Sequence, residues 1–278
     1  MPQSLNNLMF PSAQYSTSST EGRGVTLIDI LVVGDSHAKP GVSNRRFDWL
    51  GRYIAATKPS VVVDIGDSYD MESLSSYDKG KKSFEGRRYK KDIEAGQDAF
   101  NRVAHFAGKA AKRFKPRYIR LCGNHEARCD RVSEENPEFT GIITSKDCVY
   151  AGWEAYDFLH PVVVNGVSFS HYFASGRMGA AISGEYQAGT IIRKKFKSCV
   201  MGHSHIFDYC IRTAVDGTRI QGLVAGCYMD PKQYEDYAGP EANAMWWKGL
   251  VRLKNVADGA YALEQIPIET LEREYGGR

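Results

Sequence analysis

The chain has 278 residues, of which 42% are hydrophobic and 25% are charged, and its net charge at pH 7 is +3. This composition is ordinary for a soluble globular protein, and no apolar run approaches the roughly 20 residues that a membrane span requires. The composition therefore excludes a membrane-spanning protein, and so small a net charge indicates no particular partner.

The length of the chain favours one domain, which we place over residues 25–278. Residues 1–24 are rich in Ser, Thr, Asn and Gln and lack the basic start and apolar centre of a secretory signal, so we expect a flexible arm there. The six cysteines include no C-x-x-C pair. They favour reduced thiols and a cytoplasmic protein over a disulfide framework.

The first half of the domain alternates between strands and helices. Near-continuous apolar runs predict buried strands, and apolar residues at helical spacing predict helices. In chain order the pattern predicts a strand at 25–33, a helix at 44–57, a strand at 61–65, a helix at 93–113 and a strand at 118–122. A strand, a helix and a second strand are typical of a βαβ unit, which makes the two strands parallel.

Each of these strands ends in a glycine-led polar group. The groups are Gly34-Asp35-Ser36-His37, Gly66-Asp67-Ser68-Tyr69-Asp70 and Gly123-Asn124-His125-Glu126. Because the carboxyl ends of parallel strands meet at one edge of a sheet, where α/β proteins place their sites, we expect these polar side chains to lie together.

The second half is predicted to contain hairpins. Asn165-Gly166, Asp216-Gly217 and Asp258-Gly259 each separate two short apolar stretches, which is a strong signal for a tight turn between antiparallel strands. A helix is expected at residues 185–197 and a short strand at 198–201. That strand delivers Gly202-His203-Ser204-His205, in which two imidazoles at i and i+2 project to one side. Such a pair indicates a metal site only in combination with other ligands.

The polar groups taken together carry a resemblance. Asp35-x-His37, Gly66-Asp67-x-x-Asp70, Gly123-Asn124-His125-Glu126, His171 and Gly202-His203-x-His205 resemble the five ordered blocks of the calcineurin-like metallophosphoesterases. The chain is also similar in general character to bacteriophage phosphoesterases. The resemblance implies an α/β fold, a four-layer αββα sandwich of two mixed β-sheets flanked by helices, which agrees with parallel βαβ units followed by antiparallel hairpins.

The resemblance also implies two divalent transition-metal ions, with Mn favoured and Fe, Zn or Ni as alternatives. Oxygen and imidazole ligands without thiolates suit these metals, and two ions about 3.5–4 Å apart need a bridging anion, for which Asp67 is the natural candidate. The remaining ligands would be Asp35, His37 and His205 for one ion, and Asn124, His171 and His203 for the other. His160 could replace His171, but His171 follows a predicted strand, and rigid elements are where ligands belong.

The implied reaction is hydrolysis of a phosphoester. A hydroxide that bridges the two ions attacks phosphorus in line with the leaving oxygen, without a covalent phosphoenzyme. His125 would protonate the leaving oxygen, and Asp70 would orient the imidazole ring of His125 and favour its charged form. Asp70 could instead be a plain turn residue. A relative that had lost its chemistry would lack a ligand or His125, whereas all of these positions are filled here.

The sequence departs from the protein serine/threonine phosphatases of this superfamily at two positions. Those enzymes clamp a monoester phosphate with an arginine after the second aspartate of Gly-Asp-x-x-Asp and another before Gly-Asn-His-Glu, where this chain has Met71 and Cys122. These differences argue against a protein phosphatase. Arg128 could supply a phosphate contact instead.

The substrate is expected to be a phosphodiester. An insertion at about residues 71–91 follows the second polar group and carries seven Lys and Arg residues from Lys79 to Lys91, together with Phe84 and Tyr89. Cations mixed with aromatic rings that can stack on bases suit DNA, RNA or a nucleotide derivative. A phosphomonoester or a cyclic nucleotide is the alternative substrate. Further basic groups at residues 109–120 and 193–197 are typical of solvated faces, and the sequence gives no indication of oligomeric state.

Overall fold

The computed structural model describes residues 26–110, 113–235 and 238–277, and within them the chain forms two mixed β-sheets. The six-stranded sheet has the order β13-β12-β1-β2-β3-β4 and the five-stranded sheet the order β10-β11-β9-β6-β5. The strands of the first are β1 (Ile28–Val33), β2 (Val61–Asp64), β3 (Arg117–Leu121), β4 (Glu154–Tyr156), β12 (Gly249–Ala257) and β13 (Ala260–Pro267). Those of the second are β5 (Val162–Val164), β6 (Val167–Phe169), β9 (Cys199–Met201), β10 (Phe207–Thr213) and β11 (Arg219–Ala225).

The pairing within each sheet explains why the sheets are mixed. Strands β1 to β4 are parallel to one another, and β12 pairs antiparallel with β1. In the second sheet β9 is parallel to both β6 and β11, whereas β5 and β10 form antiparallel hairpins with β6 and β11. The Asn165-Gly166 and Asp258-Gly259 turns have positive φ at both residues, as a type I′ hairpin requires.

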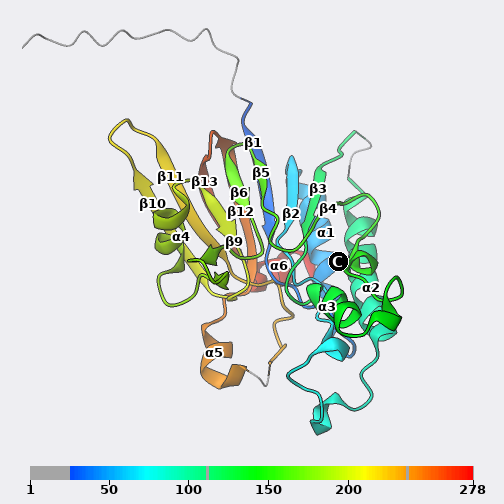
Figure 1. Cartoon of the computed structure of the whole chain (residues 1–278). Coiled ribbons are helices and arrows are strands. Elements are labelled where there is room, and N and C mark those ends of the chain that lie inside the picture. Colours follow the sequence, from blue (N-terminus) through cyan, green and yellow to red (C-terminus); the bar gives the residue numbers. More distant parts are fainter. Residues whose placement is uncertain (1–25, 111–112, 236–237, 278) are drawn as a thin grey trace, which may run out of the picture.

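Helices cover the outer face of each sheet (Figure 1). Helices α1 (Arg45–Thr57), α2 (Tyr89–Ala107) and α6 (Ile268–Tyr275) pack on the six-stranded sheet, and α4 (Gln187–Lys195) packs on the five-stranded sheet. The two sheets face each other between these helical layers. The fold is therefore the expected αββα sandwich, and the predicted fold class is confirmed.

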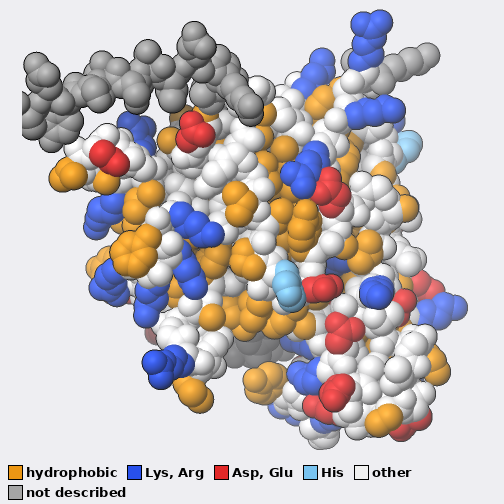
Figure 2. Space-filling view, turned by 45° about the horizontal axis from the view of Figure 1, so that its top comes forward, with side chains coloured by type: hydrophobic (Ala, Val, Ile, Leu, Met, Phe, Trp, Pro, Cys, Tyr) orange, Lys and Arg blue, Asp and Glu red, His pale blue; other side chains and the backbone are white. Residues whose placement is uncertain are grey.

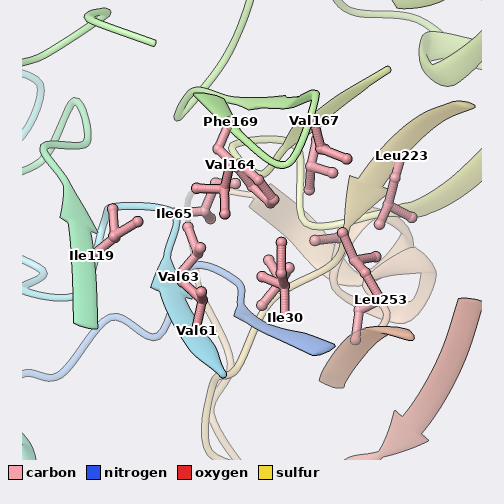
Figure 3. Packing of buried hydrophobic residues seen from close by; sticks show 14 of the residues in the cluster. Ile30, Val61, Val63, Ile65, Ile119, Val164, Val167, Phe169, Leu223 and Leu253 are labelled. Atoms are coloured by element: carbon pink, nitrogen blue, oxygen red, sulfur yellow. The ribbon is translucent and has the colours of Figure 1, made fainter. Parts of the chain in front are cut away.

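The main core lies between the two sheets (Figure 3). Ile30 and Val63 from the six-stranded sheet point toward Phe169 and Leu223 from the five-stranded sheet, and all four are fully buried. Their neighbours Leu31 and Val62 face the helices instead. Both faces of β1 and β2 are thus covered, which is why their sequences are almost continuously apolar. Each such side chain contributes about 1.5–3 kcal/mol to the free energy of unfolding.

Several elements differ from those expected. The helix expected at 93–113 begins earlier, at Tyr89, and ends at Ala107, with Gly108 as its C-cap. Asp92 in its first turn interacts favourably with the helix dipole. The helices α3 (Ala127–Glu135) and α5 (Gly239–Met245) and the short strands β7 (Ala174–Ser175) and β8 (Ala180–Ala181) were not anticipated. The flexible arm predicted for residues 1–24 lies outside the described residues.

The structure also bears on the expectations for the cysteines and for membrane-spanning segments. All six cysteines are free thiols. Among the described residues no helix is both long and apolar enough to cross a membrane.

Candidate metal centre

The loops that follow β1, β2, β3, β6 and β9 meet at one end of the two sheets and bring all seven predicted ligands together. These side chains are almost entirely withdrawn from solvent, except that Asn124 and His203 are half-buried. The ligand-type atoms fall into two main clusters, the first made by Asp35, His37 and His205 and the second by Asp67, His171 and His203. His160, the alternative to His171, is exposed and outside both clusters.

The first cluster has the geometry of a cation site. The Nε2 atoms of His37 and His205 point at each other across 3.2 Å, and His205 Nε2 also lies 3.2 Å from Asp35 Oδ2. His37 Nδ1 is hydrogen-bonded to Asp70 Oδ1 at 3.0 Å, which leaves the lone pair of Nε2 toward the cluster. Asp35 Oδ1 is buried without a hydrogen-bond partner among the described residues. A buried carboxylate oxygen without a partner, beside two convergent imidazoles, fits a bound cation.

The second cluster adds an amide oxygen. Asn124 Oδ1 lies 2.8 Å from His171 Nε2 and 2.8 Å from His203 Nδ1. His171 Nδ1 is hydrogen-bonded to the carbonyl oxygen of Ile65 at 3.1 Å, which fixes the ring and turns Nε2 toward Asp67 Oδ2, 3.4 Å away. One carboxylate, two imidazoles and one amide, without thiolate, make a set that suits Mn, Fe, Zn or Ni.

Asp67 lies between the two clusters. Its Oδ2 atom is 3.9 Å from His37 Nε2 in the first cluster and 3.4 Å from His171 Nε2 in the second. Its Oδ1 atom accepts a hydrogen bond from the backbone N–H of His125 at 2.8 Å. Asp67 is therefore the carboxylate placed to serve both clusters.

The pKa values show how strongly the centre stabilises positive charge. Burial would raise the pKa of Asp67, but the charges of His171 and His125 hold it well below its usual range. Burial would lower the pKa of His171, but Asp67 raises it to about 10. By contrast, burial lowers the pKa of His37 and of His203, which favours the neutral rings that metal ions bind. The protonated ring of His171 balances the negative charge of Asp67. A bound cation would balance the same charge in its place.

Close packing explains why glycines precede the ligands. A Cβ atom at Gly123 would lie 2.1 Å from Asp67 Oδ1, and one at Gly202 would lie 2.2 Å from Asp35 Oδ1. The ligand loops also adopt left-handed backbone conformations, with positive φ at His37, Asp67, His203 and His205. Non-glycine residues in this region cost on the order of 1 kcal/mol or more each, so other interactions must hold these loops in place.

Glu126 supplies many of those interactions, although it is not among the predicted site residues. Its Oε2 atom accepts hydrogen bonds from the backbone of Asp67 and Gly123, at 3.0 and 2.9 Å. Its Oε1 atom accepts from the backbone of Ser68 and Tyr69 and from the guanidinium of Arg120. Glu126 is fully buried and ties two ligand loops together. Its position inside the Gly-Asn-His-Glu block was the available signal.

The predicted acid and its partners lie beside Asp67. His125 Nδ1 is 2.9 Å from Asp70 Oδ1 and 2.6 Å from the Asp70 carbonyl oxygen. His125 Nε2 is 3.8 Å from Asp67 Oδ2 and accepts a hydrogen bond from Arg128 Nη2 at 3.0 Å. Asp70 thus contacts both His125 and His37. Although His125 lies close enough to His37 and Asp67 to form a third group of ligand type, the adjacent guanidinium disfavours a metal cation at its Nε2 atom.

The centre opens into a cavity of about 760 Å³. Asp67, Asn124, His125, His203 and His205 form its floor, and the insertion and the segment around residue 235 contribute walls. The insertion predicted at about residues 71–91 spans residues 71–88 in the structure, because α2 begins at Tyr89.

Few of the basic residues of the insertion line the cavity. Of its cations, Lys81 and Arg87 line the cavity, and Asp78 forms ion pairs with both. Tyr89 does not face the cavity, because its hydroxyl donates to Asp147 and its ring packs against a buried cluster. The expectation that Tyr89 stacks on bases is therefore wrong.

The basic groups at residues 109–120 and 193–197 do not line this cavity. Arg193, Lys194 and Lys197 are exposed at the end of α4 and beyond it. Lys and Arg side chains gather with hydrophobic ones over the α4 side of the molecule, at the left of Figure 2. Arg117, in the group at residues 109–120, pairs with Glu154 on β4.

Gly202→Ala is expected to empty the first cluster of metal. The added methyl group would lie 2.2 Å from Asp35 Oδ1 and 2.7 Å from Ile65 Cγ2, so the carboxylate must move and the protein loses about 1–3 kcal/mol of stability. Elemental analysis should show one ion fewer than in the wild type. Gly189→Ala is the control, because its Cβ would meet only Cys210 Sγ, at 3.8 Å. Equal metal content in both variants would contradict the assignment of Asp35.

Comparisons with known proteins give only weak likenesses, all to solved structures. Neither protein-family models nor curated proteins match the chain. Among solved structures, YfcE, a phosphoesterase from E. coli, is 12% identical and has a TM-score of 0.36, over 87% of this chain and 100% of its own. A second solved structure is 14% identical and has a TM-score of 0.30 over the same shares. Likenesses this low carry no functional conclusion, so the function of this chain must be inferred from the residues of its metal centre.

Proposed function

We propose that this chain is a dinuclear metal-dependent phosphoesterase that hydrolyses phosphodiester bonds, with nucleic acids or nucleotides as its substrates. The observation that carries the proposal is the position of Asp67 Oδ2 between two clusters of buried ligands. Asp35, His37 and His205 would hold one ion, and Asn124, His171 and His203 the other, with Asp67 shared. The bound ions, Mn in the first instance, would supply a hydroxide nucleophile at neutral pH and neutralise charge on the phosphate.

The residues of the chain then complete the hydrolysis. A hydroxide oxygen forms a new bond to phosphorus while the bond to the leaving oxygen breaks, and the leaving oxygen takes a proton from His125 Nε2. Asp70, hydrogen-bonded to Nδ1, keeps the ring oriented with Nε2 toward the cavity. Arg128 lines the same cavity and can donate to a phosphate oxygen.

Two features favour a diester over a monoester. Met71 and Cys122, which replace the two clamping arginines of related phosphatases, cannot bind the second negative charge of a monoester, and Met71 is fully buried. The cavity is also larger than a lone phosphate group requires, since the insertion extends one of its walls. A phosphomonoesterase or a cyclic-nucleotide phosphodiesterase remains the second candidate, because the same metal centre could serve either.

Metal content and diester hydrolysis test the proposal together. The purified protein is expected to contain two transition-metal ions and to hydrolyse bis-p-nitrophenyl phosphate faster than p-nitrophenyl phosphate. A chelator should abolish the activity and added Mn²⁺ should restore it, since both the nucleophile and the charge stabilisation come from the ions. Elemental analysis and absorbance of p-nitrophenolate provide the measurements. One ion or none, with activity that survives the chelator, would contradict the dinuclear assignment.

A further inference from the structure

Two tyrosines from different segments of the chain line the cavity. Tyr77 belongs to the insertion and is 83% exposed, and Tyr234 lies on the segment before α5 and is 50% exposed. The insertion and the segment of α5 lie at the same end of the sheets, where β1, β2 and β9 end (Figure 1). Large aromatic side chains are usually well buried, so two that are exposed over one metal centre suggest a ligand.

Ion pairs hold the backbone that presents Tyr77. The neighbouring Asp78 binds Arg87 at 2.8 Å through Oδ2 and Lys81 at 2.9 Å through Oδ1. These hydrogen bonds, with Arg87 the larger contributor, lower the pKa of Asp78 to about 2. Arg87 also donates to the carbonyl oxygen of Glu72 at 3.1 Å, which ties the two ends of the insertion together. The exposed ring therefore projects from a segment that is cross-linked by charge.

Tyr234 is presented in a similar way. Its neighbours Gln233 and Glu235 are only 8% and 7% exposed. Glu235 Oε1 accepts hydrogen bonds from Gln233 Nε2 at 2.8 Å and from Lys39 Nζ at 2.6 Å, and Lys39 follows the first ligand loop. Asn243 of α5 makes hydrogen bonds with both the backbone N–H and the carbonyl oxygen of Glu235. The anchors on both sides are buried, so the ring of Tyr234 is directed outward by a fixed backbone.

The charges of the cavity wall favour an uncharged group beside these rings. Lys81 is paired with Asp78, Arg87 with Asp78 and with Glu72, and Lys39 with Glu235. Among the cavity-lining cations of the described residues, Arg128 is the one that forms no ion pair with a carboxylate, and it lies next to His125 at the reacting end. The walls therefore offer rings and neutralised charges, while the floor offers sites for one phosphate.

We propose that Tyr77 and Tyr234 form a stacking site for an unpaired nucleobase attached to the phosphodiester that is cleaved. This inference rests on the proposed function and specifies its substrate as a single strand or a nucleotide derivative. Every base presents a flat π-face, so the site would accept any base in the sequence. A base within a duplex is already stacked and out of reach. Tyrosine offers a large rigid surface that loses little conformational entropy on binding.

Two diesters with the same leaving group isolate the contribution of the base. The p-nitrophenyl ester of thymidine 5′-phosphate carries a base, and methyl p-nitrophenyl phosphate does not. Tyr77→Ala and Tyr234→Ala should each lower the ratio of kcat/KM for the thymidine ester over the methyl ester by about 5- to 150-fold, the worth of one stacked base. Tyr77→Phe and Tyr234→Phe should keep the ratio, because stacking needs the ring and not the hydroxyl. Tyr186→Ala is the matched control, since Tyr186 is 74% exposed and lies outside the cavity lining.

The outcomes separate the two proposals. Hydrolysis of neither diester by the metal-loaded wild type would contradict the proposed phosphodiesterase function itself. Hydrolysis of both, with the same ratio in the wild type and in the alanine variants, would overturn the stacking site alone. In a second assay, single-stranded oligothymidylate should be cleaved at least about 10-fold faster than its duplex with oligoadenylate, because unstacking a paired base costs a few kcal/mol. Equal rates on strand and duplex would also overturn the inference.

Discussion

Asp67→Asn is expected to lower phosphodiester turnover by about 10³-fold or more and to reduce the bound metal from two ions to at most one. The substitution keeps the shape of the side chain but removes its negative charge, and Asp67 Oδ2 is the oxygen that faces both His37 and His171. Bound ions stabilise transition-state charge by several kcal/mol, and about 4 kcal/mol corresponds to 10³-fold in rate. Elemental analysis and kcat on bis-p-nitrophenyl phosphate check the two parts of this prediction.

A matched carboxylate provides the control for Asp67. Asp216 lies in the exposed turn between β10 and β11, where its Oδ1 atom accepts a hydrogen bond from the Thr218 N–H at 2.8 Å. Asp216→Asn should therefore retain two ions and normal turnover. If Asp67→Asn also retained them, a different residue would have to bridge the two clusters.

The strands that carry the centre could be predicted because they are buried on both faces. Val61, Val62 and Val63 alternate between the core and the helical layer, yet all are apolar, so the run of β2 is visible without any structure. The abrupt change to a glycine-led polar group marks the end of each strand. Parallel pairing then brings the groups after β1, β2 and β3 to one edge of the six-stranded sheet, whereas His171, His203 and His205 follow strands of the other sheet and were grouped with them only by the family resemblance.

The interactions that hold the ligand loops could not be predicted in the same way. Glu126 contacts Asp67 and Arg120 through hydrogen bonds that follow no sequence period, since they depend on how three loops meet in space. The same applies to the wall of the cavity. The basic composition of the insertion suggested a cationic track, but Lys81 and Arg87 are balanced by two carboxylates, Asp78 and Glu72. Composition records the number of charges and not their partners. The prediction therefore concerned the cations of the insertion and did not include Tyr77 and Tyr234.

His125→Ala should keep both metal ions yet lose roughly 10²- to 10⁴-fold in rate on alkyl phosphodiesters, the usual worth of a positioned general acid. Esters of p-nitrophenol should lose much less, because p-nitrophenolate leaves without protonation. His105→Ala is the control, since His105 is exposed on α2. Rate constants for an alkyl ester and a p-nitrophenyl ester, measured with metal content, make the comparison. Loss of an ion would instead identify His125 as a ligand.

Arg128 adds a condition to this prediction. Its guanidinium donates to His125 Nε2 at 3.0 Å, so this nitrogen holds a lone pair there and has no proton to give. Burial and Arg128 lower the pKa of His125, whereas Asp67 and Asp70 raise it, and the balance raises it above its ordinary value. A phosphate oxygen that draws Arg128 away would free Nε2 for a proton at the moment when the leaving group needs one. Equal losses on alkyl and p-nitrophenyl esters in His125→Ala would show that the ring only positions Arg128 or the phosphate.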